Sequence, residues 1–183
     1  MHLLALLGLP DSGSVAINEQ VATNLKRREL ESLRNKEFGF VFQQFFLNPR
    51  ESVLENVTLP LKIAGAPTRS RNQAGMEILA KFGLAEKAKN KATALSGGQK
   101  QRVVIARALV NSPSVIFADE PTGNLDSATG KVVVDSPFDP NRERGITLVI
   151  VTHDPDLAAK CSRQIHMKDG VIVSETTSEV SAQ

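Results

Sequence analysis

The chain has 183 residues, of which 41% are hydrophobic and 23% are charged, so it is long enough and apolar enough to fold around one buried core. The net charge of +2 is too small to favour nucleic acid or an anionic membrane surface as a partner. The single cysteine, Cys161, excludes an internal disulfide, and no cluster of Cys and His has zinc-ligand spacing. No apolar run approaches the roughly 20 residues of a membrane-spanning helix. These features favour a globular protein of a reducing, cytosolic compartment.

The N-terminal residues Met1–Leu7 are almost all apolar, and residues 14–16 have the small side chains of a signal-peptide cleavage site. A secretory signal is therefore one interpretation of this segment. No Lys or Arg precedes the apolar stretch, however, which argues against secretion. We expect instead the end of an amphipathic helix.

Hydrophobic periodicity divides the rest of the chain into alternating strands and helices. In chain order it predicts a strand at Phe38–Phe42, helices at about 52–64, 69–82 and 97–110, a strand at Ser114–Ala118, a helix at about 125–135, a strand at Ile146–Val151, and a hairpin at Arg163–Ser174 that turns at Asp169 and Gly170. The three strands lack polar alternation, which is typical of parallel strands buried on both faces. The pattern predicts a layered α/β fold with a mostly parallel central sheet, in one domain over residues 1–183.

Two serines begin capping boxes, Ser52 with Glu55 and Ser96 with Gln99, and therefore mark helix starts. After Ser96, two glycines leave backbone N–H groups open to a ligand at the positive end of the helix dipole. A phosphate is the anion that such a helix start suits. A Ser-Gly-Gly turn alone is also common as a flexible cap.

Polar residues follow directly after each predicted strand. They are Gln43 after the first, Asp119 and Glu120 after the second, and Thr152, His153 and Asp154 after the third. The carboxyl ends of parallel strands form one edge of the sheet, where ligands bind in open α/β folds. A single polar ending would be ordinary, but three matching endings predict a metal-assisted site at this edge.

A more specific pattern is carried by five segments: Phe40–Gln43, Leu95–Gln99, Val115–Thr122, Gly123–Asp126 and Val151–Asp154. They resemble the Q-loop, signature motif, Walker B strand, D-loop and switch-histidine loop of ABC-transporter ATPases. The resemblance runs from Leu3 to about Ser174. It implies a P-loop NTPase-like fold, with a small helical subdomain at about 48–110 and a C-terminal hairpin. Gly123–Asp126, together with Leu54–Leu61, is similar to the lipoprotein-releasing and macrolide-export type.

The resemblance implies a role for each matched residue. Glu120 would orient or deprotonate the attacking water, and His153 would contact the γ-phosphate of ATP. Asp119 would hold the Mg²⁺ shell, and Gln43 would link metal and nucleotide to the membrane partner. The signature residues Ser96, Gly97, Gly98 and Gln99 would close over the nucleotide bound to a second subunit. Asp126 would make a contact with that subunit across the dimer.

The phosphate-binding pattern GxxxxGK[ST] of the Walker A motif is absent from the 183 residues, since the only Gly-Lys pair, Gly130-Lys131, is followed by Val132. The segment Leu3–Leu9 is similar to the helix that follows this loop in the family. We therefore expect an N-terminally truncated domain that begins just past the loop. A second departure is Ser136–Pro140, where prolines should stop the preceding helix near Asp135.

The family resemblance implies an ATP-hydrolysing subunit that powers a membrane exporter of the lipoprotein-release or macrolide and peptide type, with ATP and Mg²⁺ as cofactors. It would pair with a second ATPase subunit and with integral membrane permease subunits, and not with nucleic acid. It would lie in the cytoplasm, peripheral on the inner face of the cell membrane. The alternative is a non-enzymatic pairing module, or an inactive fragment, that donates its signature motif to an intact ATPase.

Overall fold

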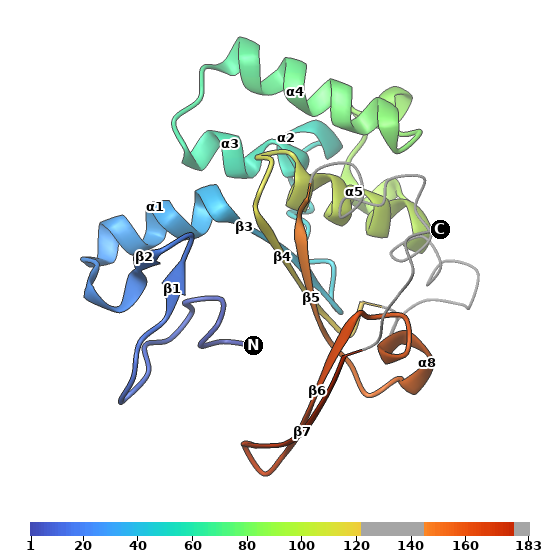
Figure 1. Cartoon of the computed structure of the whole chain (residues 1–183). Helices are drawn as coiled ribbons and strands as arrows, with labels where there is room; N and C mark the ends of the chain where they lie inside the picture. The colour runs from blue at the N-terminus through green and yellow to red at the C-terminus, as the bar shows by residue number, and fades with distance from the viewer. Residues whose placement is uncertain (122–144, 178–183) are drawn as a thin grey trace.

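The computed structural model describes residues 1–121 and 145–177. At its centre is a parallel sheet in the order β3 (Phe38–Phe42), β4 (Val115–Asp119) and β5 (Thr147–Val151) (Figure 1). The register pairs Phe42 with Asp119 and Asp119 with Val151, so the three carboxyl ends lie level at one edge. The three predicted strands are thus confirmed to within one residue. The helix predicted at 125–135, with its end near Asp135, lies outside the described residues.

Helices and two hairpins surround this sheet. Before β3 come β1 (Ala16–Ile17), β2 (Gln20–Val21), the 3-10 turn η1 (Ala22–Asn24) and α1 (Arg27–Glu37). Between β3 and β4 lie α2 (Val53–Val57), α3 (Leu59–Ile63), α4 (Thr68–Lys81), η2 (Ala85–Lys87), η3 (Ala92–Ala94) and α5 (Gly97–Leu109). After β5 come α8 (Pro155–Ala158) and the predicted hairpin, β6 (Arg163–Lys168) with β7 (Val171–Thr177). Within the described ranges, no helix has the length and apolar character needed to cross a membrane.

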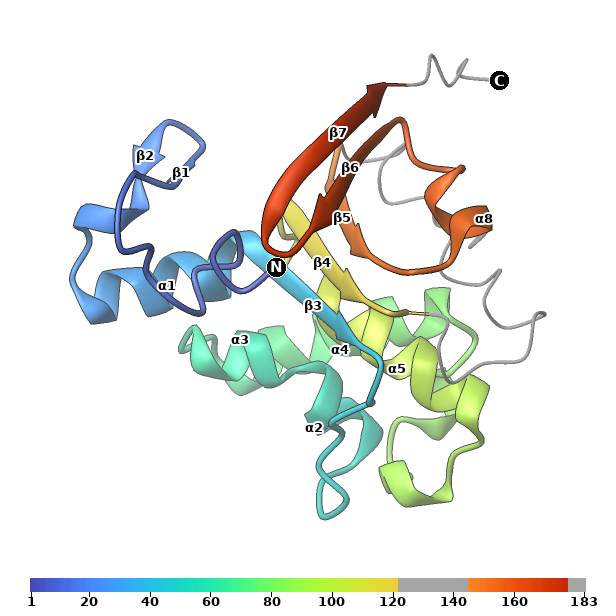
Figure 2. The same cartoon turned by 90° about the horizontal axis from the view of Figure 1, so that it is seen from below.

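The two faces of the sheet are covered by different parts of the chain. On one face α5 packs against β3, and α2 and α4 pack against α5, as Figures 1 and 2 show. On the other face Phe38 and Phe117 pack with the N-terminal residues Ala5, Leu6 and Ala22. The strands β3 and β4 are therefore covered on both faces, as predicted. The strand β5 is more exposed than expected, because among the described elements it pairs only with β4.

Two expected helices differ in the structure. The helix expected at 52–64 is divided into α2 and α3, because Pro60 lacks the N–H that would continue the first helix and its ring would collide with the preceding turn. The hydroxyl of Thr58 caps this break by donating to the carbonyl of Leu54, at 2.8 Å. The N-terminal helix expected at Met1–Leu7 is wrong: these residues form hydrogen-bonded turns, and Leu6 has a φ of +53°.

The helix α5 approaches β3 so closely that only glycine fits at one position. A Cβ on Gly39 would lie 2.5 Å from the carbonyl oxygen of Ala108, which is backbone and cannot swing aside. The missing side chain therefore lets the helix and the strand meet backbone to backbone. This contact sets the distance between α5 and the sheet.

We predict that Gly39→Ala lowers the free energy of unfolding by about 1–3 kcal/mol, because the added methyl group forces α5 away from β3. Urea unfolding followed by circular dichroism measures the change. Gly8→Ala is the matched control, since its Cβ would meet only the Leu3 side chain, at 4.0 Å. Equal stability of the two variants would show that α5 can shift without loss.

The carboxylate of Glu37 fastens the other end of the sheet, where the strands begin. It accepts hydrogen bonds from the hydroxyl of Ser114, which precedes β4, and from the side-chain amide of Asn18, at 3.1 Å. The ammonium of Lys36 lies 3.1 Å away. The Ser114 hydrogen bond is the main reason why the pKa of Glu37 is lowered from its usual value of 4.5, and Lys36 and Asn18 lower it further against the opposing effect of burial.

A carboxylate whose pKa is lowered by folding stabilises the protein above its unfolded pKa and loses that effect as pH falls through its folded pKa. Glu37→Gln should therefore reduce the free energy of unfolding by about 1 kcal/mol at pH 7, since hydrogen bonds to a charged acceptor are lost. The difference from the parent chain should shrink below pH 4.5, the usual pKa of this group. Urea unfolding at pH 7 and near pH 3 tests this, and a difference that did not depend on pH would contradict it.

Candidate functional site

The predicted polar residues lie together at the carboxyl edge of the sheet. Because Phe42, Asp119 and Val151 share one level of the register, the next residues, Gln43, Glu120 and Thr152, leave their strands side by side. The strand β4, which ends at Asp119 and leads directly into Glu120, is in the middle. The amide N–H of Glu120 donates to the carbonyl of Val151 at 2.9 Å, so the ladder continues one residue beyond β4.

The side chain of Glu120 is bound to the loop that follows β5. Its Oε1 accepts a hydrogen bond from the backbone N–H of His153 at 2.9 Å and lies 2.8 Å from the ring atom Nδ1 of the same residue. With an ionised carboxylate as acceptor, Nδ1 carries the proton of a neutral His153 ring. The Glu120 side chain is only 21% exposed, whereas that of His153 is 89% exposed. The carboxylate is therefore held in place while the histidine ring remains open to a ligand.

Thr152 joins Glu120 to the next helix. Its hydroxyl donates to Oε2 of Glu120 at 3.2 Å and accepts from the backbone N–H of Asp154 at 3.0 Å. The Asp154 carboxylate accepts from the N–H groups of Asp156 and Leu157, so it caps α8. No role was predicted for Thr152, because its partner is 32 residues away and no local spacing indicates the contact.

The backbone of Glu120 is left-handed, with a φ of +43°. This conformation costs a non-glycine residue about 1–3 kcal/mol and persists only where neighbouring contacts fix it. Here the backbone bond to Val151 and the side-chain bonds to Thr152 and His153 provide those contacts. Such strain is typical of functional sites, and it turns the carboxylate toward the end of β5.

The glycine-rich start of α5 has the predicted capping box. The Ser96 hydroxyl accepts from the N–H of Gln99 at 3.3 Å, and the Gln99 side chain accepts from the N–H of Ser96 at 3.0 Å. A Cβ on Gly97 would meet no heavy atom within 4 Å, so the first turn offers open backbone N–H groups, with half-buried Gly98 beside it. Among the described residues, no hydrogen bond joins this turn to Glu120 or His153.

A buried glutamine ties α5 to the loop after Glu120. The side-chain amide of Gln101 donates to the carbonyl of Pro121 at 3.3 Å, and Gln101 is 2% exposed. The sequence does not predict this contact, because the two residues are 20 positions apart. It brings the second turn of the signature helix beside the carboxyl edge of β4.

The groups available for a metal are few but suitable for Mg²⁺. Asp119 is half-buried at the end of β4, and Gln43 is exposed at the end of the neighbouring strand. Mg²⁺ commonly keeps several waters and binds one or two carboxylates together with phosphate oxygens, so this pair of oxygen donors fits it. In the described parts of the chain, no group of three or more His, Cys, Asp or Glu forms a cage for a cation. Asp126 lies outside the described residues.

Comparison with known proteins gives a consistent result. The sequence profile of the ABC transporter family matches residues 1–123. The lipoprotein-releasing system ATP-binding protein LolD of Bacteroides thetaiotaomicron is 46% identical over 172 residues, which are 94% of this chain and 79% of LolD. The macrolide export ATP-binding/permease protein MacB of Syntrophobacter fumaroxidans is 46% identical over 179 residues, which are 96% of this chain and 25% of that protein. A solved dimer of the ATP-binding cassette MJ0796, bound to ADP and Pi after hydrolysis, matches with a TM-score of 0.84 and 40% identity, over 96% of this chain and 78% of that one.

The chain folds around a parallel sheet and matches a solved structure that holds ADP. It is therefore an α/β domain of the nucleotide-binding class. The profile match and the identity to LolD show that the chain belongs to the ABC transporter family, in which it corresponds to the ATPase domain. The expected family and fold class are thereby confirmed.

The missing Walker A pattern limits what these 183 residues can bind. A P-loop supplies several charge-assisted hydrogen bonds to phosphate, and losing four of them at about 1.5 kcal/mol each removes roughly 6 kcal/mol, or about four decades of affinity. We therefore predict negligible ATP binding by the 183-residue chain in isothermal titration calorimetry, and no hydrolysis above background. Micromolar affinity for ATP would contradict this prediction.

Proposed function

We propose that these residues belong to the ATP-hydrolysing subunit of an exporter of the lipoprotein-releasing or macrolide-export type. The observation that carries the proposal is the fixed Glu120 carboxylate beside the open His153 ring, at the edge of a sheet matched to an ATP-binding cassette. LolD and MacB are named as ATP-binding proteins of two export systems, which supports an ATPase role over that of a non-enzymatic pairing module.

In this proposal Glu120 orients the attacking water and accepts its proton. Among the described residues its Oε2 accepts only the bond from Thr152, which leaves a lone-pair direction for a water, and His153 and Thr152 keep the carboxylate oriented. The exposed His153 ring contacts the γ-phosphate. Asp119 and Gln43 would hold the Mg²⁺ shell, and a bound Mg²⁺ would supply positive charge against the phosphate oxygens.

The same proposal assigns the open first turn of α5 to a partner's nucleotide. The residues concerned are Ser96, Gly97, Gly98 and Gln99, and Asp126 contacts the second ATPase subunit. We further propose one ATPase domain over residues 1–183, with a helical subdomain at about 48–110. Gln43 would face permease subunits, and the chain would lie peripherally on the inner face of the cell membrane.

The test restores a nucleotide site by grafting the Walker A segment of LolD onto the N-terminus. In this protein we expect Glu120→Gln to lower turnover at least about 100-fold, because the general base is lost while size and most hydrogen bonding are kept. Mg²⁺ and ATP should still bind and hold two subunits together. Size-exclusion chromatography with ATP measures the dimer, and phosphate release measures the turnover.

Adding Ser96→Arg to Glu120→Gln should abolish the ATP-dependent dimer, because the long side chain blocks the signature turn. The matched control is Ser32→Arg, which adds the same side chain at an exposed position of α1. Full hydrolysis by the Glu120→Gln protein, or a dimer that survives Ser96→Arg, would show that these roles are wrongly assigned.

A further inference from the structure

The guanidinium of Arg107, near the end of α5, is bound to the segment that follows Gln43. Its Nη1 donates to the carbonyl of Phe46 at 2.8 Å, and its Nη2 donates to the carbonyl of Phe45 at 3.1 Å. Among the described residues, no carboxylate lies within ion-pair distance of Arg107. The two N–H donors of the planar guanidinium are therefore directed at two successive carbonyl groups. They form a pair of charge-assisted hydrogen bonds.

The backbone that Arg107 contacts is strained and little buried. Phe46 has a φ of +44°, in the left-handed region that disfavours non-glycine residues, and its side chain is among the exposed apolar ones, at 64%. Its ring meets the ring of Phe42 edge to face, with centroids 5.7 Å apart. Burial of the Phe46 side chain does not explain this conformation. Among the described residues, the bonds from Arg107, the ring contact with Phe42 and the packing of Phe45 and Leu47 against the main core hold it.

The reach of Arg107 is set by the close contact between α5 and β3. Ala108, the next residue, is the one whose carbonyl oxygen leaves no space for a side chain on Gly39. Burial in this packing lowers the pKa of Arg107, which nevertheless stays charged. The guanidinium is thus fixed relative to the strand that ends just before Gln43.

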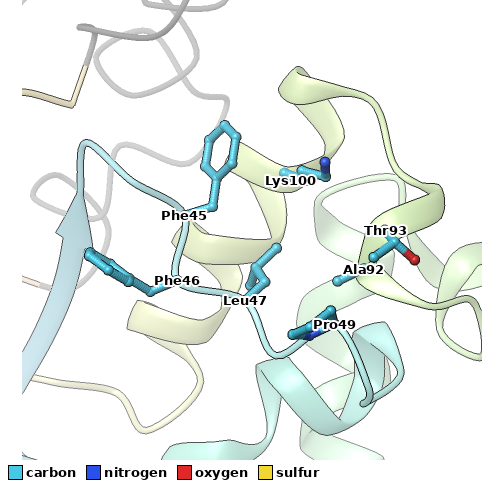
Figure 3. Close-up of a pocket in the computed structure, with 7 residues that line it drawn as sticks. All are labelled: Phe45, Phe46, Leu47, Pro49, Ala92, Thr93 and Lys100. Atoms are coloured by element: carbon cyan, nitrogen blue, oxygen red, sulfur yellow. The ribbon is translucent and has the colours of Figure 1, made fainter.

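Beside the clamped segment is a cavity of about 270 Å³. Figure 3 shows Phe45, Phe46 and Leu47 on one side, with Ala92, Thr93 and Lys100 across from them. Unfilled space therefore lies beside the segment, while Phe45 and Leu47 also pack against the main core.

We propose that Arg107 is a positioning residue for Gln43. Gln43 follows Phe42, which the sheet fixes, and lies two residues before Phe45, whose carbonyl Arg107 fixes, so its backbone spans a short arc between two anchors. Because Ser96 of the signature motif caps the start of α5, the same helix anchors both the Q-loop segment and the signature turn. The importance of Gln43 rests on the proposed function, but the clamp itself does not.

The test measures the segment directly in the 183-residue chain, without nucleotide. Arg107→Gln should lower the NMR backbone order parameters of residues 43–47 from about 0.85 to below about 0.6, while those of β3 and α5 stay unchanged. The carbonyl ¹³C resonances of Phe45 and Phe46 should move in the direction of a lost hydrogen bond. Arg107→Lys keeps the charge but not the fork, and should give intermediate values.

Arg69→Gln is the matched control, because it removes the same charge from an exposed position of α4. It should leave the order parameters and both carbonyl resonances unchanged. Unchanged order parameters in Arg107→Gln would overturn the proposal. So would an equal loss of order throughout β3 and α5, since Arg107 would then only hold the domain together. If Arg107→Gln does not fold, the comparison of Arg107→Lys with the parent chain decides in the same way. Loss of the proposed ATPase role would leave these results unaffected.

Discussion

The structure depends on the contact between α5 and β3, where Gly39 lies directly on the carbonyl of Ala108. A side chain at this point would move the helix outward by a few tenths of an ångström or more. Gln101 and Arg107 would then be displaced from the carbonyl groups of Pro121, Phe45 and Phe46, because hydrogen bonds tolerate little change in distance. Because Gly39 has no side chain, α5 can hold in place the segments that follow the neighbouring strands β3 and β4.

Much of the architecture could be predicted from local pattern. The apolar runs, the capping boxes at Ser52 and Ser96, and Asp154 before Pro155 each have a physical cause within a few residues, and the structure has each of them. The division of the helix at Pro60 has an equally local cause, because the missing N–H and the ring of proline outweigh the apolar pattern that favours one continuous helix. The N-terminal turns could not be predicted in this way, because apolar residues alone do not distinguish a helix from a turn that packs against a sheet.

The site was predicted less completely than the fold. Strand ends and spacing indicated which residues lie at the edge, and the register explains why this succeeded. The contacts that orient those residues depend on partners far apart in the chain. Glu120 and Thr152 are 32 residues apart, and Arg107 and Phe45 are 62 residues apart. No periodic pattern in the sequence therefore predicts these contacts. A left-handed Glu120 or Phe46 was equally beyond prediction, because neither residue type favours that conformation.

The hydroxyl of Thr152 allows the hydrogen bonds around Glu120 to adjust when the charge of that carboxylate changes. A backbone N–H can only donate, whereas a hydroxyl can rotate its proton and exchange the roles of donor and acceptor. While Glu120 is ionised, Thr152 donates to it and accepts from Asp154. When Glu120 carries a proton, Thr152 can turn its own proton away and accept from the new acid through its second lone pair. The hydrogen-bond network around Glu120 can therefore follow a proton on and off the carboxylate without moving a heavy atom.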